Sequence, residues 1–203
     1  MITAREQFTQ NIVRVRETGL LYESVTNLTP SAVDSTDILR MQIILSVSSL
    51  DSLIHGLVLN GIIEILEGKR EPTKETQKVM ISISSVKKAL NDGSLLDTIK
   101  DEIILRTGYQ SYQTPEKISD AMKCFTAKKI WKEVALITKF DTSEIIQKKL
   151  RIIVDRRNQI VHQADAHPIY PATRWEIEKS TVDENVNFIE TIGLAIYDIA
   201  KLS

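Results

Sequence analysis

Most of the chemistry that this sequence offers is concentrated in the eight residues from Asp155 to His162, DRRNQIVH. They place two guanidinium groups, a carboxylate, a carboxamide and an imidazole in an otherwise apolar helical segment, although the chain has only 3 histidines. A guanidinium binds phosphate, and an imidazole transfers protons near neutral pH. Arginine, a polar residue and histidine are the side chains that RNA cleavage without a metal ion requires.

The helical spacing of these side chains gives them different surroundings. At about 100° per residue, a polar stripe runs along one face, and within it Asn158 lies one turn before His162, so that both can act on one ligand. Arg157 falls near the middle of the apolar face, which we expect to be core. The stripe comprises Asp155, Asn158, His162 and Asp165, and the apolar face comprises Ile146, Leu150, Ile153, Val154, Ile160 and Val161.

An arginine on a core face must find a carboxylate or a phosphate, because an unpaired buried charge is very costly. Asp51, in the apolar stretch 47–55, is the expected partner of Arg157 or Arg156. His55 lies one turn after Asp51 on the same face and is a candidate supporting or substrate contact. By spacing alone, a buried ion-pair network between two core helices, with a purely structural role, also explains the whole group.

The surrounding sequence predicts an all-α fold in a single domain over residues 1–203. No long stretch alternates with period two, and glycine (7) and proline (5) are scarce. The segment from Thr36 to Leu66 is apolar nearly all round, which indicates the middle of a bundle. Further helices are expected at 3–26, 73–90, 95–105 (capped by Ser94 with Asp97) and 114–139 (with a break near Thr126). The next helix is expected to begin at a capping box of Asp141 with Glu144 and to stop at 167–171. The last helix is expected to begin at a capping box of Thr181 with Glu184 and to run through Ile199.

Composition restricts the classes of ligand and compartment. A formal net charge of −1 and a pI of about 6.3 exclude a bulk polycation, so nucleic acid would bind through a local basic patch. One cysteine, Cys124, excludes an intrachain disulfide framework, and no histidine and carboxylate spacing indicates a metal site, so we expect no cofactor. Polar residues interrupt the most apolar stretch and no signal peptide is visible, so we expect a cytoplasmic protein without a membrane span.

A second basic region surrounds Phe125 and Trp131. In one interpretation its lysines bind RNA while the aromatic rings stack on bases. An amphipathic helix with core aromatics and solvated lysines explains the same pattern, and we favour that interpretation. The lysines are Lys123, Lys128, Lys129 and Lys132.

The segment from Arg157 to His162 resembles the R-x4-H motif of the HEPN superfamily, with a polar residue directly after the arginine. The blocks 50–58 and 153–165 resemble the RiboL-PSP-type HEPN group, as does a final apolar helix after a loop that follows the motif. The resemblance covers roughly residues 38–202. Gln163 stands where a carboxylate often follows the histidine in this group, which makes the local charge less acidic.

The resemblance implies an α-helical bundle with long antiparallel core helices, often dimerising so that two motifs face a shared cleft. It also implies a metal-independent endoribonuclease that cleaves RNA by 2′-hydroxyl attack, frequently in toxin–antitoxin or phage-defence settings, where an antitoxin protein is a further partner. One histidine cannot easily serve as base and acid on opposite sides of the phosphorus. A homodimer supplies two histidines, so we expect a composite active site.

Carried over to this chain, the resemblance implies catalytic roles for three residues. His162 would transfer protons, Arg157 would stabilise the negative charge of the phosphorane, and Asn158 would orient the phosphate or the imidazole. Asp51, His55, Asp155 and Arg156 would support them. Two alternatives remain open: Arg156 is the phosphate ligand and Arg157 is structural, or the chain is a non-catalytic HEPN-type module that binds a partner protein or RNA.

Overall fold

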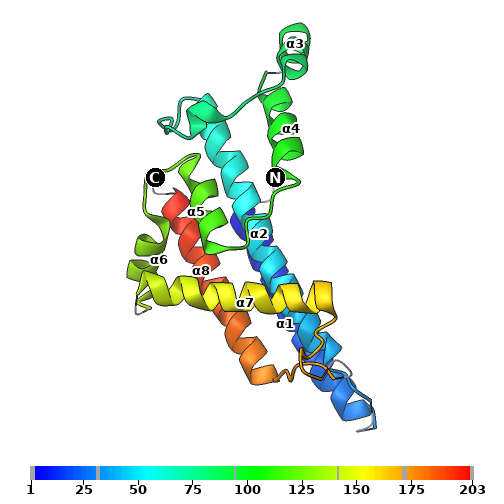
Figure 1. Ribbon diagram of the computed structural model, residues 1–203. Helices are drawn as coiled ribbons and strands as arrows, with labels where there is room; N and C mark the ends of the chain where they lie inside the picture. The colour runs from blue at the N-terminus through cyan, green and yellow to red at the C-terminus, as the bar shows by residue number, and fades with distance from the viewer. Residues whose placement is uncertain (1–2, 31–32, 94, 141, 171–172, 202–203) are drawn as a thin grey trace.

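The computed structural model describes residues 3–30, 33–93, 95–140, 142–170 and 173–201. Within these ranges the regular elements are helical apart from an isolated bridge between Ala166 and Arg174, which confirms the predicted all-α fold (Figure 1). The elements are α1 (Ala4–Leu28), α2 (Asp37–Leu66), a 3-10 turn (Thr76–Lys78), α3 (Ile83–Asp92), α4 (Leu95–Thr107), α5 (Pro115–Lys123), α6 (Ile130–Thr138), α7 (Ser143–Gln163) and α8 (Lys179–Lys201).

Helix α2 forms the centre of the bundle and packs against α1, α7 and α8 (Figure 1). Most of its apolar character follows from this position, since Leu39, Val47 and Leu50 are fully buried, whereas Met41 and Leu45 on the same helix are exposed. By length and composition alone α2 would also suit a membrane span, but 56% of its most apolar stretch lies inside the bundle. Burial in a protein core therefore accounts for most of this part of the sequence.

Helices α1 and α2 run antiparallel and approach closely at Gly19. A Cβ atom added there would lie only 2.6 Å from Nε2 of Gln42. The buried Gln42 amide occupies this space and donates a hydrogen bond to the backbone carbonyl of Val15 at 3.0 Å. The close contact holds the two long helices side by side, as expected for antiparallel core helices.

Helix α7 crosses α2 and carries the motif at its far end (Figure 1). Thr142 caps it by accepting a hydrogen bond from the backbone N–H of Ile145, whereas the predicted cap, Asp141, lies outside the described residues. The apolar face is buried from Ile146 to Val154, but Ile160 is only partly buried and Val161 is 44% exposed. The predicted core face therefore ends before the motif, and the last two turns project beyond the core.

Several predicted helix boundaries were wrong, among them the stop at 167–171, because α7 ends at Gln163. The segment 73–90 is not one helix, because the chain is extended at Val79 and at Ser82, whose side chain caps α3 by accepting from the Ser85 backbone N–H. The predicted break near Thr126 is confirmed, since residues 114–139 form two helices, α5 and α6, on either side of it, and α5 starts at Pro115 as predicted. Helix α8 begins at Lys179, so Thr181 lies inside it and is not its cap. The predicted Ser94 cap lies outside the described residues.

Candidate active site at the end of helix α7

The motif occupies the last two turns of α7, which ends at Gln163. His162 is exposed, and Arg157 and Asn158 are partly buried. The helix positions Asn158 one turn before His162, so their side chains leave the same side of the helix. Asp155 is exposed on the preceding turn. A ligand that reaches His162 therefore also meets Asn158.

Arg157 is turned toward this polar side by a contact with its neighbour. Its Nη1 donates a hydrogen bond to Oδ1 of Asn158 at 3.2 Å. Its Nε is buried and has no hydrogen-bond partner, and no carboxylate of the described residues forms an ion pair with it. A guanidinium whose partner among the described residues is a neutral amide keeps an uncompensated positive charge, which can attract an anion to its terminal nitrogens.

The predicted ion pair of Asp51 with Arg157 or Arg156 was wrong. Asp51 instead accepts hydrogen bonds from the backbone N–H of Tyr112 at 2.5 Å and from Nε2 of Gln113 at 3.2 Å. A carboxylate in the middle of a core helix needs donors, and the loop before α5 supplies one from its backbone and one from a side-chain amide. Asp51 therefore anchors that loop to α2.

His55 belongs to the same loop contact. Its Nε2 lies 3.8 Å from Oδ1 of Asp51, and its ring centroid lies 4.6 Å from that of Tyr112. The predicted position of His55 one turn beyond Asp51 is thus correct. Like Asp51, His55 contacts the loop at Tyr112. Both residues therefore have a structural role, which is to hold this loop against α2.

Asp165 was predicted to continue the polar stripe, but it is completely buried. The helix has ended by then, and Ala164 and Asp165 both adopt left-handed backbone angles, with φ of 49° and 59°. This turn directs the Asp165 carboxylate inward, where its Oδ2 accepts from Nε of Arg40 at 2.7 Å and from Nη2 of Arg156 at 2.9 Å. Nη1 of Arg156 lies 2.7 Å from the other oxygen, Oδ1.

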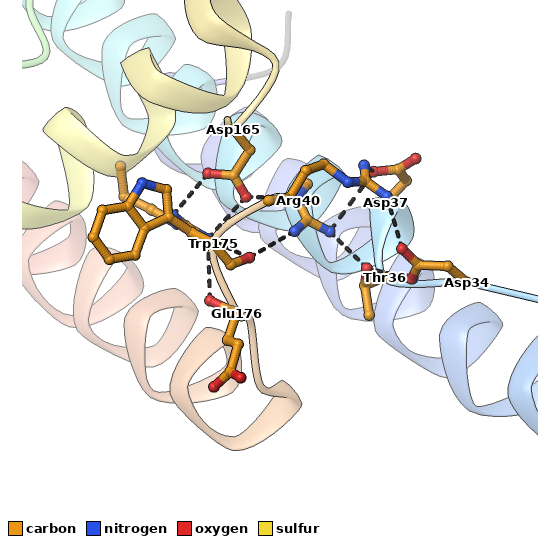
Figure 2. A network of polar contacts seen from close by, with 9 residues as sticks. Asp34, Thr36, Asp37, Arg40, Asp165, Trp175 and Glu176 are labelled. Atoms are coloured by element: carbon orange, nitrogen blue, oxygen red, sulfur yellow. Dashed lines mark hydrogen bonds and ion pairs between the residues drawn. The ribbon is translucent and has the colours of Figure 1, made fainter. Parts of the chain in front are cut away.

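These contacts belong to a polar network between the start of α2, the end of α7 and the loop that follows it (Figure 2). Arg40 also donates to the backbone carbonyl of Trp175 at 2.9 Å and to Oγ1 of Thr36 at 2.6 Å. Arg156 reaches the backbone carbonyl of Glu176 at 3.2 Å. On the outside, Arg174 pairs with Asp34 and Asp37. The network fixes the loop against both helices.

Arg156 is therefore a member of this network. Burial lowers the pKa of its guanidinium, Asp165 opposes that shift, and the nearby charge of Arg40 adds to it. An arginine pKa is so high that the group stays charged at neutral pH. Sequence reasoning missed Arg40 altogether, although a charged residue inside the apolar pattern of α2 was a usable signal.

The basic region on α5 and α6 shows the arrangement that we favoured. Phe125 is 2% exposed and Trp131 is 6% exposed, and the indole N–H of Trp131 donates to the backbone carbonyl of Pro115. Both rings are core residues, so they offer no face on which a base could stack.

Comparisons with known proteins support the resemblance that the motif suggested. The family model RiboL-PSP-HEPN matches residues 10–201, which extends further toward the N-terminus than the motif blocks do. Neither the search of curated proteins nor that of solved structures found a match. Because the matched region includes all of α2, α7 and α8, which build and carry the R-x4-H segment, this chain belongs to the RiboL-PSP-HEPN family.

Proposed function

We propose that this protein is a metal-independent endoribonuclease whose active site is formed by Arg157, Asn158 and His162. Membership of the HEPN family is compatible with a ribonuclease or a nucleotide-related function. The observation that carries the proposal is the state of Arg157: its guanidinium contacts Asn158, it forms no ion pair with a carboxylate of the described residues, and the exposed His162 lies one turn after Asn158. These are the requirements for holding a phosphate beside a proton-transfer group.

The reaction that fits these groups is a transesterification within the RNA strand. The 2′-hydroxyl loses its proton and attacks the adjacent phosphorus, and the bond from phosphorus to the 5′-oxygen breaks. The 5′-oxygen takes up a proton, which leaves a 2′,3′-cyclic phosphate and a 5′-hydroxyl. His162 transfers a proton, Arg157 balances the added negative charge of the phosphorane, and Asn158 orients the phosphate or the imidazole.

A homodimer completes this mechanism, because base and acid act on opposite sides of the phosphorus and each chain supplies one motif histidine. Exposed apolar residues are the sequence neighbours of His162 and of Arg40, which contacts Asp165 beyond the end of α7, and this supports association at this end. Val161 precedes His162 and is 44% exposed, and Met41 follows Arg40 and is 50% exposed. We also propose a cytoplasmic toxin or phage-defence effector, with an antitoxin protein as its regulatory partner.

The decisive test is cleavage of single-stranded RNA by the purified protein in the presence of EDTA. We expect products with cyclic phosphate and 5′-hydroxyl ends, and a loss of about 100-fold or more in rate for His162→Ala and for Arg157→Ala. Gln163→Ala is the matched control, because Gln163 is exposed, adjacent to His162 and outside the proposed site. It should retain wild-type activity.

The second hypothesis is a non-catalytic HEPN-type helical module. The ion pair of Arg156 with the buried Asp165 favours this hypothesis, because it shows that part of the charged cluster stabilises the fold. Wild-type protein that cuts no RNA, or His162→Ala protein that unfolds, would support this module and contradict the enzyme.

A further inference from the structure

We infer that Asp165 is a positioning residue for the R-x4-H segment, and that it determines which of two adjacent arginines is available to a substrate. The inference rests on the proposed function. Arg156 and Arg157 are neighbours in the sequence, and sequence reasoning could not decide between them as the phosphate ligand. Their surroundings in the structure differ, and the difference originates in one buried carboxylate.

Arg156 is committed to internal contacts. Its two terminal nitrogens lie 2.7 and 2.9 Å from the two oxygens of Asp165, and Nη2 also reaches the backbone carbonyl of Glu176. A guanidinium that already lies within ion-pair distance of both oxygens of a carboxylate has little remaining charge for a phosphate. Among the described residues, the hydrogen-bond partner of the Arg157 guanidinium is the neutral amide of Asn158. The charge that a phosphate would meet is therefore that of Arg157.

The same ion pair encloses the motif. Arg156 immediately precedes it and Asp165 lies nine residues further along, beyond His162. At the end of the enclosed segment, the backbone N–H groups of Ala164 and Asp165 both donate to the carbonyl of Gln159. The ion pair of Arg156 with Asp165 thus links the two ends of the last two turns of α7. These turns project beyond the core, and without the link they would fray as exposed helix ends do.

Arg40 connects this closed end to the body of the protein. It is 5% exposed and shares Oδ2 of Asp165 with Arg156. Its other carboxylate contact, with Asp37, is long at 3.7 Å. Two partly or fully buried arginines therefore depend on one carboxylate, and removing its charge leaves both without adequate compensation. The orientation of the motif relative to α2 depends on the same group.

The test is hydrogen exchange of the free protein together with steady-state RNA cleavage, comparing wild type with Asp165→Asn. We expect amides between residues 157 and 166 to exchange about tenfold faster or more, while those of α1 and α8 keep their wild-type rates. We expect kcat to fall about tenfold or more and KM to change less, because the reacting groups are misplaced but the remaining RNA contacts stay.

Arg174→Gln is the matched control. Arg174 is a charged residue of the same loop whose ion pairs with Asp34 and Asp37 lie on the outside and do not involve Asp165. It should leave both the exchange rates of 157–166 and RNA cleavage unchanged. If it loosened the segment as much as Asp165→Asn does, any loop contact would suffice and the inference would be overturned.

Arg156→Gln covers the case in which Asp165→Asn does not fold, since it leaves Asp165 paired with Arg40. It should loosen the same amides; unchanged exchange would contradict the inference. Because exchange is measured without RNA, failure of the proposed ribonuclease function can be distinguished from failure of the positioning role of Asp165. If wild-type protein cuts no RNA, the proposed function fails and exchange alone judges the positioning. If Asp165→Asn cuts RNA like wild type, the positioning role fails.

Discussion

Arg157 donates from Nη1 to Oδ1 of Asn158 at 3.2 Å, and this contact turns an arginine of the apolar side toward the side of the helix that carries His162. The two motif ends, five residues apart, do not share a helix face by spacing alone. Asn158 resolves this geometry, because it contacts Arg157 as a direct neighbour and lies one turn from His162. The amide between the two is therefore expected to align the guanidinium.

Asn158→Ala should reduce RNA cleavage about tenfold without unfolding the protein. The side chain is partly exposed, so its loss should alter the free energy of unfolding by roughly 1 kcal/mol or less. The guanidinium would lose its orienting acceptor, and the effect should appear mainly in kcat. Cleavage assays and thermal unfolding measure the two quantities. A variant with full activity would show that Arg157 needs no alignment by Asn158.

Asp51→Ala should destabilise the protein and leave the chemistry of the folded molecules unchanged. It removes the acceptor of the Tyr112 backbone N–H and of the Gln113 amide, which costs about 1–3 kcal/mol for each donor left buried without a partner. Denaturant unfolding measures the loss, and cleavage per folded molecule tests the chemistry. A selective loss of kcat in stable protein would instead return Asp51 to the active site.

The sequence was sufficient to predict the helical class, the long central helix and the location of the motif, because these depend on local periodicity and on a short signature. The partner of each charge was not predictable in this way. The sequence pattern pairs Asp51 with an arginine because both fall on apolar helix faces, but the backbone donors of a loop are invisible in a side-chain pattern.

The position of Asp165 shows the same limit more sharply. A helical wheel placed it on the stripe with His162, yet two consecutive residues with positive φ turn the chain inward one residue after the helix ends. Neither Ala164 nor Asp165 is glycine, so composition gave no warning of this turn. The ion pair with Arg40 joins residues 125 positions apart, and only the folded chain brings them together.

Helix α3 should loosen from α4 in acid through protonation of Glu102. Hydrogen bonds from Ser85 and Arg106 lower the pKa of this buried carboxyl from 4.5 to about 2. A depressed pKa stabilises the folded form above the unfolded value, so this contribution should be complete above about pH 4.5 and disappear as the pH falls toward 2. Hydrogen exchange of α3 across this range measures it.

Glu102→Gln provides the comparison for that measurement, because the amide keeps the shape but has no charge to titrate. Exchange in α3 should be faster than in wild type at pH 5 and should show a weaker dependence on pH below it. The same pH response in both proteins would place the titrating group elsewhere.

Replacing both Met41 and Leu45 by Asp should convert the proposed dimer to monomers and reduce RNA cleavage in parallel. The two side chains lie one turn apart on α2, are 50% and 38% exposed, and start one residue after Arg40, which contacts Asp165 at the end of the motif helix. Because they are exposed, the monomer should still fold, whereas buried carboxylates would oppose an apolar interface. Light scattering measures the mass and cleavage assays measure the activity.

Leu136→Asp is the control, since Leu136 is 74% exposed but lies on α6, away from the end of α7 that carries the motif (Figure 1). Full activity in a monomeric double variant would show that one motif suffices, and the composite site would have to be abandoned.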